Sequence, residues 1–237
     1  MSVNNQERLI LWDIDHTLLD GGGVSRDAYA SAFARVIRSP MAEMADMTGK
    51  TELLIAAETL ELNGLTPSRD LLTTFITAVA DELTARSHIL AARGHVLPGA
   101  AEALEALSGI PGIHQSVLTG NMRTLAELKL KTFGLITHLN LEAGAYGDDA
   151  QERVALLPHA WQRAQEHYGR EFRGAETVIV GDTLLDIATA KSGDARVIAV
   201  ATGSAPLETL REAEADAVLP DLSDTQAFVK AVLASTA

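Results

Sequence analysis

The sequence predicts a doubly wound, mainly parallel α/β sheet with an α-helical domain inserted after its first strand. Two apolar runs, at residues 9–12 and 177–180, each end abruptly in acidic residues. A short apolar run without alternation is typical of a parallel strand that is covered on both faces. Between the first run and the next predicted strand, residues 24–90 carry apolar side chains at helical spacing. A helical block at that place indicates an insertion into the sheet.

The inserted segment is predicted to be almost entirely helical. Apolar residues such as Tyr29 and Phe33 recur at 3.6-residue spacing, and such stripes more often form a bundle core than a binding site. Turn-forming segments at 21–23 and 93–99 flank the block and suit hinges. We therefore predict a core domain of residues 1–20 and 96–237 and a helical domain of residues 21–95.

Strands and helices alternate beyond residue 98, as a parallel sheet with crossover helices requires. The predicted elements are a helix at 100–107, a strand at 115–118, helices at 121–131 and 154–168, and strands around Val178 and Val197 with a helix between them. Apolar periodicity and turn residues set these bounds. The alternation completes the predicted doubly wound sheet.

Two acidic pairs follow the two apolar runs. Asp13 and Asp15 stand at a strand end, where open α/β sheets place ligands, and adjacent carboxylates there are costly unless a cation binds them. Asp182 and Asp186 are spaced so that one helical turn brings both toward one side. Hard carboxylate ligands in a chain without Cys favour Mg²⁺ over zinc or copper. We predict a shared Mg²⁺ site; the alternative is that Asp182 only caps the next helix.

A third strand end carries Thr119-Gly120-Asn121 ahead of a predicted helix. Backbone N–H groups at such a helix start bind anions. The same three residues also occur in ordinary strand-to-helix turns. The order of the three strand-end motifs along the chain therefore carries more weight than this motif alone.

These motifs resemble those of the haloacid dehalogenase superfamily of phosphotransferases. Its members carry an Asp-x-Asp pair, a Ser or Thr after a strand, a Lys or Arg, and a second acidic pair. Asp13 with Asp15, Thr119, and Asp182 with Asp186 match three of these four motifs in the same order. The resemblance covers most of the chain and implies a Rossmann-like core with a C1-type helical cap.

The basic motif residue is assigned to Arg153, which stands at a predicted helix start about where relatives carry it before the final acidic motif. Lys129 and Lys131 are the alternatives, and the apolar pattern of their helix predicts that both lie on its solvent-exposed face. His16 departs from the family pattern, because relatives usually carry Gly there. The turn after the first acidic pair must therefore accommodate a side chain.

The resemblance implies phosphoryl transfer with Asp13 as the nucleophile and an aspartyl-phosphate as the intermediate. Asp15 is expected to serve as the general acid and base. The expected phosphate-binding groups are Thr119, the N–H groups near Gly120 and Asn121, and Arg153. The expected Mg²⁺ ligands are Asp13, the main-chain carbonyl of Asp15, and Asp182, with Asp186 in support.

The second Asp of the first pair favours phosphate-ester chemistry, because dehalogenases and phosphonatases of this superfamily carry a different residue there. The chain looks most like phosphoglycolate phosphatase and its neighbours. Two alternatives remain: a phosphomutase of the beta-phosphoglucomutase type, in which Val commonly stands at the position of Thr17, and a non-catalytic protein that binds a phosphorylated metabolite. Lys50 is expected to touch substrate from the cap, or to be a solvated residue at a helix start.

The composition favours a small phosphorylated metabolite over nucleic acid as the partner. The formal net charge is −13, whereas phosphate backbones attract stripes of Lys and Arg. No apolar stretch approaches the ~20 residues that cross a bilayer, and the first residues lack a signal-peptide pattern. We therefore expect a cytoplasmic monomer or homodimer without a membrane partner. The absence of Cys excludes thiol chemistry.

Overall fold

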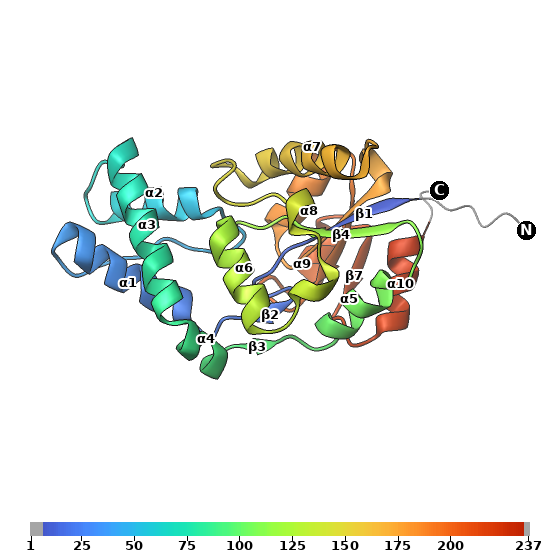
Figure 1. The fold of residues 1–237 in the computed structure, drawn as a ribbon, viewed down its shortest axis with the longest axis horizontal. Coiled ribbons are helices and arrows are strands. Elements are labelled where there is room, and N and C mark those ends of the chain that lie inside the picture. Colours follow the sequence, from blue (N-terminus) through green and yellow to red (C-terminus); the bar gives the residue numbers. More distant parts are fainter. Residues whose placement is uncertain (1–6, 235–237) are drawn as a thin grey trace, which may run out of the picture.

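The computed structural model describes residues 7–234 and contains a five-stranded sheet in the order β4-β1-β5-β6-β7 (Figure 1). The strands are β1 (Arg8–Trp12), β4 (Ile113–Val117), β5 (Thr177–Gly181), β6 (Arg196–Val200) and β7 (Ala217–Leu219). Each neighbouring pair is parallel. The predicted parallel α/β sheet is confirmed, and β1 lies inside it between β4 and β5.

Helices cover both faces of this sheet (Figure 1). One layer comprises α5 (Ala100–Ser108), α6 (Arg123–Thr132) and α10 (Thr225–Leu233), and the other α7 (Leu156–Tyr168), α8 (Leu184–Lys191) and α9 (Leu207–Glu212). Ile10 and Trp12 of β1 pack in the core beneath the first layer, whereas Leu9 and Leu11 pack beneath the second. Burial on both faces explains why β1 is a continuous apolar run.

Four of the helices between β1 and β4 pack against one another at one end of the molecule (Figure 1). They are α1 (Val24–Ile37), α2 (Glu52–Leu62), α3 (Arg69–Ala85) and α4 (Ser87–Arg93). Tyr29, Phe33 and Phe75 lie in their shared core, with the rings meeting edge to face. The short strands β2 (Leu19–Asp20) and β3 (His95–Val96) pair antiparallel where the chain enters and leaves this group. The helices fall within the predicted insertion, and its boundaries as a domain stay a prediction.

Residues 38–51 form a loop, although the sequence pattern predicts helix through almost the whole insertion. Arg38 ends α1 in the left-handed conformation, with φ of 64°. Farther along, the Asp46 carboxylate accepts hydrogen bonds from the main-chain N–H and the hydroxyl of Thr48. Such local bonds compete with helix formation. The end of this loop contacts the segment ahead of α7, because the Gly49 carbonyl accepts a hydrogen bond from Arg153.

The chain beyond β6 contains three elements that the sequence pattern did not predict: α9, β7 and α10. β7 has only three residues, all half-buried, so it lacks the apolar run that marks the central strands. Short 3₁₀ helices lie at Ile136–His138, Leu141–Ala143, Arg153–Ala155 and Gly174–Glu176. Within residues 7–234, no helix is long and apolar enough to cross a membrane.

Candidate active site

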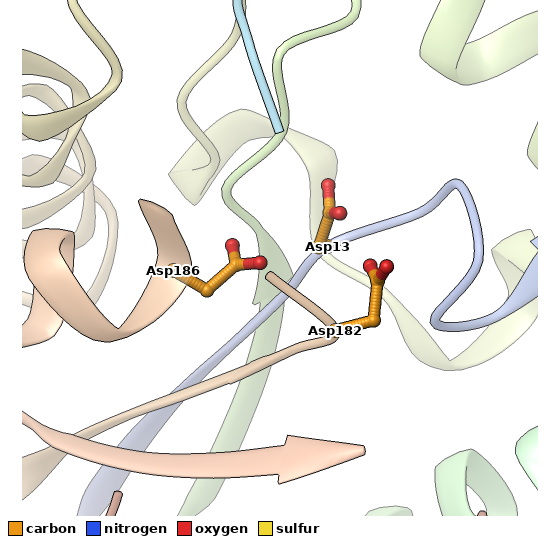
Figure 2. Close-up of side chains that lie close together, drawn as sticks. All are labelled: Asp13, Asp182 and Asp186. Atoms are coloured by element: carbon orange, nitrogen blue, oxygen red, sulfur yellow. The ribbon is translucent and has the colours of Figure 1, made fainter. Parts of the chain in front are cut away.

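Three buried carboxylates meet at the carboxyl-terminal edge of the sheet (Figure 2). Asp13 follows β1 and Asp182 follows β5, and these two strands are paired neighbours. Asp186 comes from the first turn of α8. Each offers an oxygen within 4.8 Å of the oxygens of the other two. The predicted convergence of the two strand-end acidic motifs is therefore observed for these three residues.

Local geometry explains how Asp186 reaches the cluster. Thr183 is the N-cap of α8, and its N–H and hydroxyl donate to Asp186 Oδ2 at 3.0 and 2.6 Å. Gly181 is required beside it, because a Cβ there would lie 2.2 Å from Asp186 Cγ. Asp182 is thus not the cap of α8, and its carboxylate is left for the site. Thr17, buried in the turn after β1, donates to Asp182 Oδ1 at 3.2 Å.

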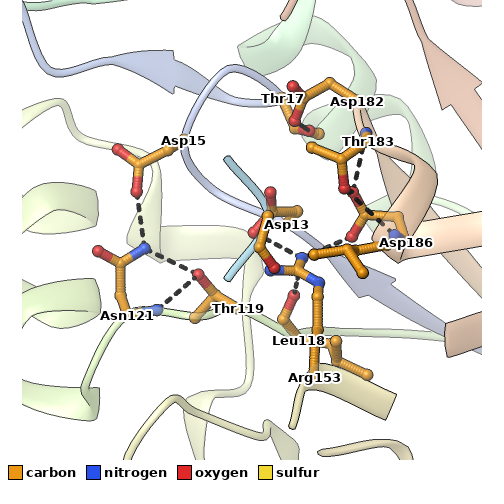
Figure 3. Close-up of polar contacts among 12 residues, drawn as sticks. Asp13, Asp15, Thr17, Leu118, Thr119, Asn121, Arg153, Asp182, Thr183 and Asp186 are labelled. Atoms are coloured by element: carbon orange, nitrogen blue, oxygen red, sulfur yellow. Dashed lines mark hydrogen bonds and ion pairs between the residues drawn. The ribbon is translucent and has the colours of Figure 1, made fainter. Parts of the chain in front are cut away.

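Arg153 lies among these carboxylates (Figure 3). Its Nη2 is 3.0 Å from Asp13 Oδ1 and 2.5 Å from Asp186 Oδ1, and the residue is 4% exposed. Arg153 belongs to the short helix Arg153–Ala155, just ahead of α7, which agrees with the predicted place at a helix start. The structure thus brings Arg153 to the predicted nucleophile. Although burial opposes it, the carboxylates of Asp13 and Asp186 raise the pKa of Arg153.

The cluster has the electrostatic character of a cation site. Burial, and then the neighbouring carboxylates, raise the pKa of Asp182 to about 8. Burial also raises the pKa of Asp13 to about 6, in spite of Arg153. Asp186 Oδ1 accepts a hydrogen bond from Arg153, and its Oδ2 accepts one from Thr183. Asp13 and Asp182 are therefore better placed than Asp186 to ligate a cation directly. An oxygen-only donor set of this kind fits Mg²⁺.

Stability should fall as the pH rises when divalent cations are absent. The pKa values of Asp13 and Asp182 are higher in the folded protein, at about 6 and about 8, than the ordinary carboxyl value. Their contribution to stability is therefore complete below the ordinary carboxyl pKa and is lost as the pH rises through 6 and 8. The midpoint of thermal unfolding in EDTA should accordingly decrease between about pH 5 and about pH 8.5.

Added Mg²⁺ should raise that midpoint, and more so at the higher pH, because it binds the ionised carboxylates. At one hundred times its dissociation constant a ligand stabilises by about 2.7 kcal/mol, roughly 5–11 °C for a chain of this size. Asp182→Asn is the matched control and should abolish the Mg²⁺ response. A response of the same size in Asp182→Asn would contradict the assignment of the cation site.

The predicted phosphate-binding segment follows β4. Thr119 is fully buried, and its hydroxyl accepts hydrogen bonds from the Asn121 N–H at 3.3 Å and from Asn121 Nδ2 at 2.8 Å. Gly120 lies against Lys50 at the end of the 38–51 loop, and its carbonyl accepts the N–H of Glu52, the first residue of α2, at 2.8 Å. Thr119, Gly120 and Asn121 all line the same cavity as Asp13. The structure therefore brings this segment to the carboxylate cluster, as predicted.

Asp15 lies to one side of the three clustered carboxylates (Figure 3). Lys129 Nζ is 2.8 and 2.7 Å from its two carboxylate oxygens, and Asn121 Nδ2 donates to it at 2.7 Å. Burial alone would raise the pKa of Asp15, but Lys129 and Asn121 outweigh burial and hold this pKa below its ordinary value. The carboxylate is 35% exposed, so one side of it faces the cavity.

The expectation that Lys129 lies on the solvent-exposed face of its helix is wrong. Lys129 is 2% exposed, whereas Lys131 lies on the surface and pairs with Glu127. The buried face of α6 contains Leu125, Ala126 and Leu130, and position 129 is four residues beyond Leu125. The position of a lysine on that apolar stripe was the feature of the sequence that could have indicated its burial. Its charge is tolerated because Asp15 is there to pair with it.

The cavity that contains these groups has a volume of about 690 Å³. Its far wall comes from the helical insertion, with residues 44–50 of the loop, Glu52 and Ile55. Lys50 lines the cavity, and its Nζ forms an ion pair with Glu58 at 2.5 Å. Contact of Lys50 with substrate stays a prediction.

One buried, cavity-lining residue of the insertion, Glu52, was not predicted as part of the site. Glu52 is 5% exposed, and its carboxylate accepts a hydrogen bond from the Tyr29 hydroxyl. Burial raises the pKa of Glu52.

His16 lines the same cavity. Its φ is 58°, in the left-handed region, which explains why Gly suits this turn. The His16 carbonyl accepts a hydrogen bond from the Thr202 hydroxyl.

Gly120→Ala should disturb the contact between the phosphate-binding segment and the 38–51 loop. A Cβ at Gly120 would lie 2.0 Å from the Lys50 carbonyl oxygen, so the loop must move. We expect a higher KM for substrate and a loss of about 1–3 kcal/mol in unfolding free energy. Gly109→Ala is the control, because the nearest atom to its Cβ would be 3.8 Å away. Equal effects of the two substitutions would refute this contact as a determinant of KM.

Structural comparison finds similar folds over nearly the whole chain. A hydrolase from Pseudomonas syringae has 21% sequence identity and a TM-score of 0.71, with 97% of this chain and 100% of that one covered. A predicted phosphoglycolate phosphatase from Haemophilus somnus has 19% identity and a TM-score of 0.69, with 94% and 98% covered. A protein from Thermotoga maritima, provisionally assigned as a beta-phosphoglucomutase, has 18% identity and a TM-score of 0.61, with 95% and 100% covered. At these identities the likeness shows the fold alone.

Sequence comparison gives the family. No curated protein matches the chain significantly. The family model of the haloacid dehalogenase-like hydrolases matches residues 7–194, which include the three clustered carboxylates, Asp15 and Arg153. With the parallel sheet and this order of strand-end motifs, the match shows that the chain belongs to the haloacid dehalogenase-like hydrolases.

Proposed function

We propose that the protein is a Mg²⁺-dependent phosphatase that hydrolyses a small phosphate monoester through an aspartyl-phosphate on Asp13. The observation that carries the proposal is the position of Asp13. It is buried at a strand end, contacts Arg153, lies in a cluster with two further carboxylates, and lines the cavity of about 690 Å³. A nucleophilic carboxylate needs neighbouring positive charge before it can meet an anionic phosphate.

Asp13 and Asp182 would hold the metal, with Asp186 fixed behind them by Thr183 and Arg153. When bound, Mg²⁺ supplies positive charge that offsets the repulsion between carboxylates and phosphate. Arg153 adds a permanent positive charge next to Asp13. The phosphate-binding segment Thr119-Gly120-Asn121 borders the same space and supplies hydroxyl and amide groups for phosphoryl oxygens.

The reaction has two halves. In the first, an Asp13 carboxylate oxygen attacks phosphorus, the bond from phosphorus to the ester oxygen breaks, and Asp15, which must be protonated for this step, gives that oxygen its proton. In the second, Asp15 takes a proton from water as the water oxygen attacks the aspartyl-phosphate, releasing phosphate and restoring Asp13. The exposed side of the Asp15 carboxylate faces the cavity where both transfers would occur.

The helical insertion would act as a cap that selects the substrate. The loop residues 44–50 and Glu52 form the cavity wall that faces the sheet edge. A cavity of about 690 Å³ suits a small phosphorylated metabolite. Phosphoglycolate is the first candidate, because the chain resembles phosphoglycolate phosphatases and one of its structural neighbours is described as one.

The test is release of free phosphate from a panel of small phosphate monoesters, including phosphoglycolate, with Mg²⁺ or with EDTA. We expect free phosphate to be released with Mg²⁺ and not with EDTA. Sugar phosphate isomerisation that depends on a bisphosphate activator, without free phosphate, would indicate a phosphomutase instead. Binding of phosphate analogues without metal dependence and without turnover would indicate a non-catalytic protein.

A further inference from the structure

A second buried cation stands in the site, and the reaction as described above does not use it. Lys129 is 2% exposed, and its ammonium is 2.8 and 2.7 Å from the two Asp15 oxygens and 2.7 Å from Asn121 Oδ1. All three donor hydrogens of the ammonium can therefore be engaged. Burying an ammonium group is costly unless it is paired and hydrogen-bonded, and Asp15 and Asn121 offset that cost here.

The two buried cations serve different carboxylates. Arg153 contacts Asp13 and Asp186, at the metal cluster. Lys129 contacts Asp15, which lies to one side of that cluster (Figure 3). The Lys129 side chain is 3% exposed and the Asp15 side chain is 35% exposed. Both residues line the cavity, but Lys129 is almost fully buried, whereas part of the Asp15 side chain stays exposed.

The same lysine connects Asp15 to the phosphate-binding segment. Asn121 donates through Nδ2 to both Asp15 and the Thr119 hydroxyl, while its Oδ1 accepts from Lys129. Rotation of the Asn121 amide would exchange its donor and acceptor, and the ammonium, which can only donate, opposes that rotation. Lys129 therefore fixes both the Asp15 carboxylate and the orientation of the amide that links it to Thr119.

We propose that Lys129 is a positioning residue, which holds Asp15 at a set place relative to the phosphate-binding segment so that it can exchange protons with the leaving group and with water. This inference rests on the proposed phosphatase function. It assigns to Lys129 a role separate from that of Arg153, which serves the nucleophile. It predicts that Lys129 matters only for those steps in which Asp15 moves a proton.

Two substrates separate those steps. Nitrophenolate leaves p-nitrophenyl phosphate without needing a proton, whereas the alkoxide leaving from glycerol phosphate needs one. In both cases hydrolysis of the aspartyl-phosphate needs Asp15 to take a proton from water. The ratio kcat/KM reports the first half of the reaction, and kcat includes the second.

The experiment compares Lys129→Met with the wild type and with Lys131→Met, a matched change two residues along the same helix at an exposed position. For Lys129→Met with p-nitrophenyl phosphate and Mg²⁺, we expect kcat/KM within about threefold of wild type. We expect kcat to fall by about tenfold or more, KM to fall in parallel, and a burst of one nitrophenolate per site. With glycerol phosphate, kcat/KM itself should fall by about tenfold or more. Lys131→Met should match the wild type throughout.

Thermal unfolding of each variant checks that it folds. If Lys129→Met does not fold, Lys129→Gln, which keeps an amide donor, replaces it. Equal losses of kcat/KM on the two substrates, or unchanged kinetics, would overturn the positioning role and leave the phosphatase intact. A wild-type protein that releases phosphate from no small ester would overturn the proposed function, and this inference with it.

Discussion

Asp13→Asn should abolish turnover, with a loss of roughly 10⁴-fold or more in kcat, the scale seen when a covalent nucleophile is removed. The amide has nearly the same shape as the carboxylate but cannot form the acyl phosphate. It also removes one negative charge from the three buried carboxylates; burial, and then repulsion from neighbouring carboxylates, raises the pKa of Asp13 and Asp182. We therefore expect the metal-free variant to unfold at a higher temperature than the wild type while being inactive.

The control for this prediction is Asp70→Asn, the same change at an exposed position in the first turn of α3. It should leave turnover unchanged. Phosphate release is measured at saturating substrate with Mg²⁺, and unfolding is followed in EDTA. An Asp13→Asn protein that keeps a tenth or more of wild-type turnover would rule out Asp13 as the nucleophile.

Arg153→Met should produce the largest loss of stability among single changes in the site. Arg153 is the buried cation that contacts both Asp13 and Asp186, at 3.0 and 2.5 Å. Its removal leaves closely spaced buried carboxylates without that partner, which typically costs about 3–5 kcal/mol. For a chain of this size the unfolding midpoint should fall by about 6–20 °C. The loss should be greater at pH 8 than at pH 5, because the carboxylates can protonate at the lower pH.

Mg²⁺ should recover more stability in Arg153→Met than in the wild type, since the cation replaces part of the missing charge. The matched control is Arg211→Met, which breaks the ion pair with Glu208 at 2.6 Å, where the two side chains are 54% and 74% exposed. The free energy of unfolding should fall by no more than about 1 kcal/mol, as is typical of solvent-accessible ion pairs. If the two variants lost the same stability, the carboxylate cluster would not depend on Arg153.

The parts of the site at strand ends could be predicted from the sequence. Asp13 and Asp182 follow continuous apolar runs, and paired parallel strands present their carboxyl ends at one edge of the sheet. Once two such runs were recognised, their acidic residues had to lie close together. Thr119 follows β4, the other neighbour of β1, and could be placed by the same argument.

The parts that depend on long-range packing could not be predicted. Lys129 stands on the apolar stripe of α6, but a lysine is ordinarily assigned to the outer face unless the packing of the helix against Asp15 is known. The 38–51 loop has helix-like apolar spacing, but hydrogen bonds such as that of Asp46 with Thr48 favour a turn. Nothing in the sequence indicated that Glu52 is buried, because its burial depends on the hydrogen bond from Tyr29 of another helix.

The most direct test of the account is to trap the phosphoryl group on Asp13. Asp15→Asn is the variant to use, because it keeps the nucleophile and lacks the group that activates water for the second half of the reaction. The protein is mixed with p-nitrophenyl phosphate and Mg²⁺, quenched with borohydride, which reduces an acyl phosphate to an alcohol, and digested for mass spectrometry. The account predicts that the side chain of Asp13 is reduced, and that EDTA prevents this. Turnover of the same ester with Asp13 unreduced, or with the phosphoryl group on another residue, would contradict it.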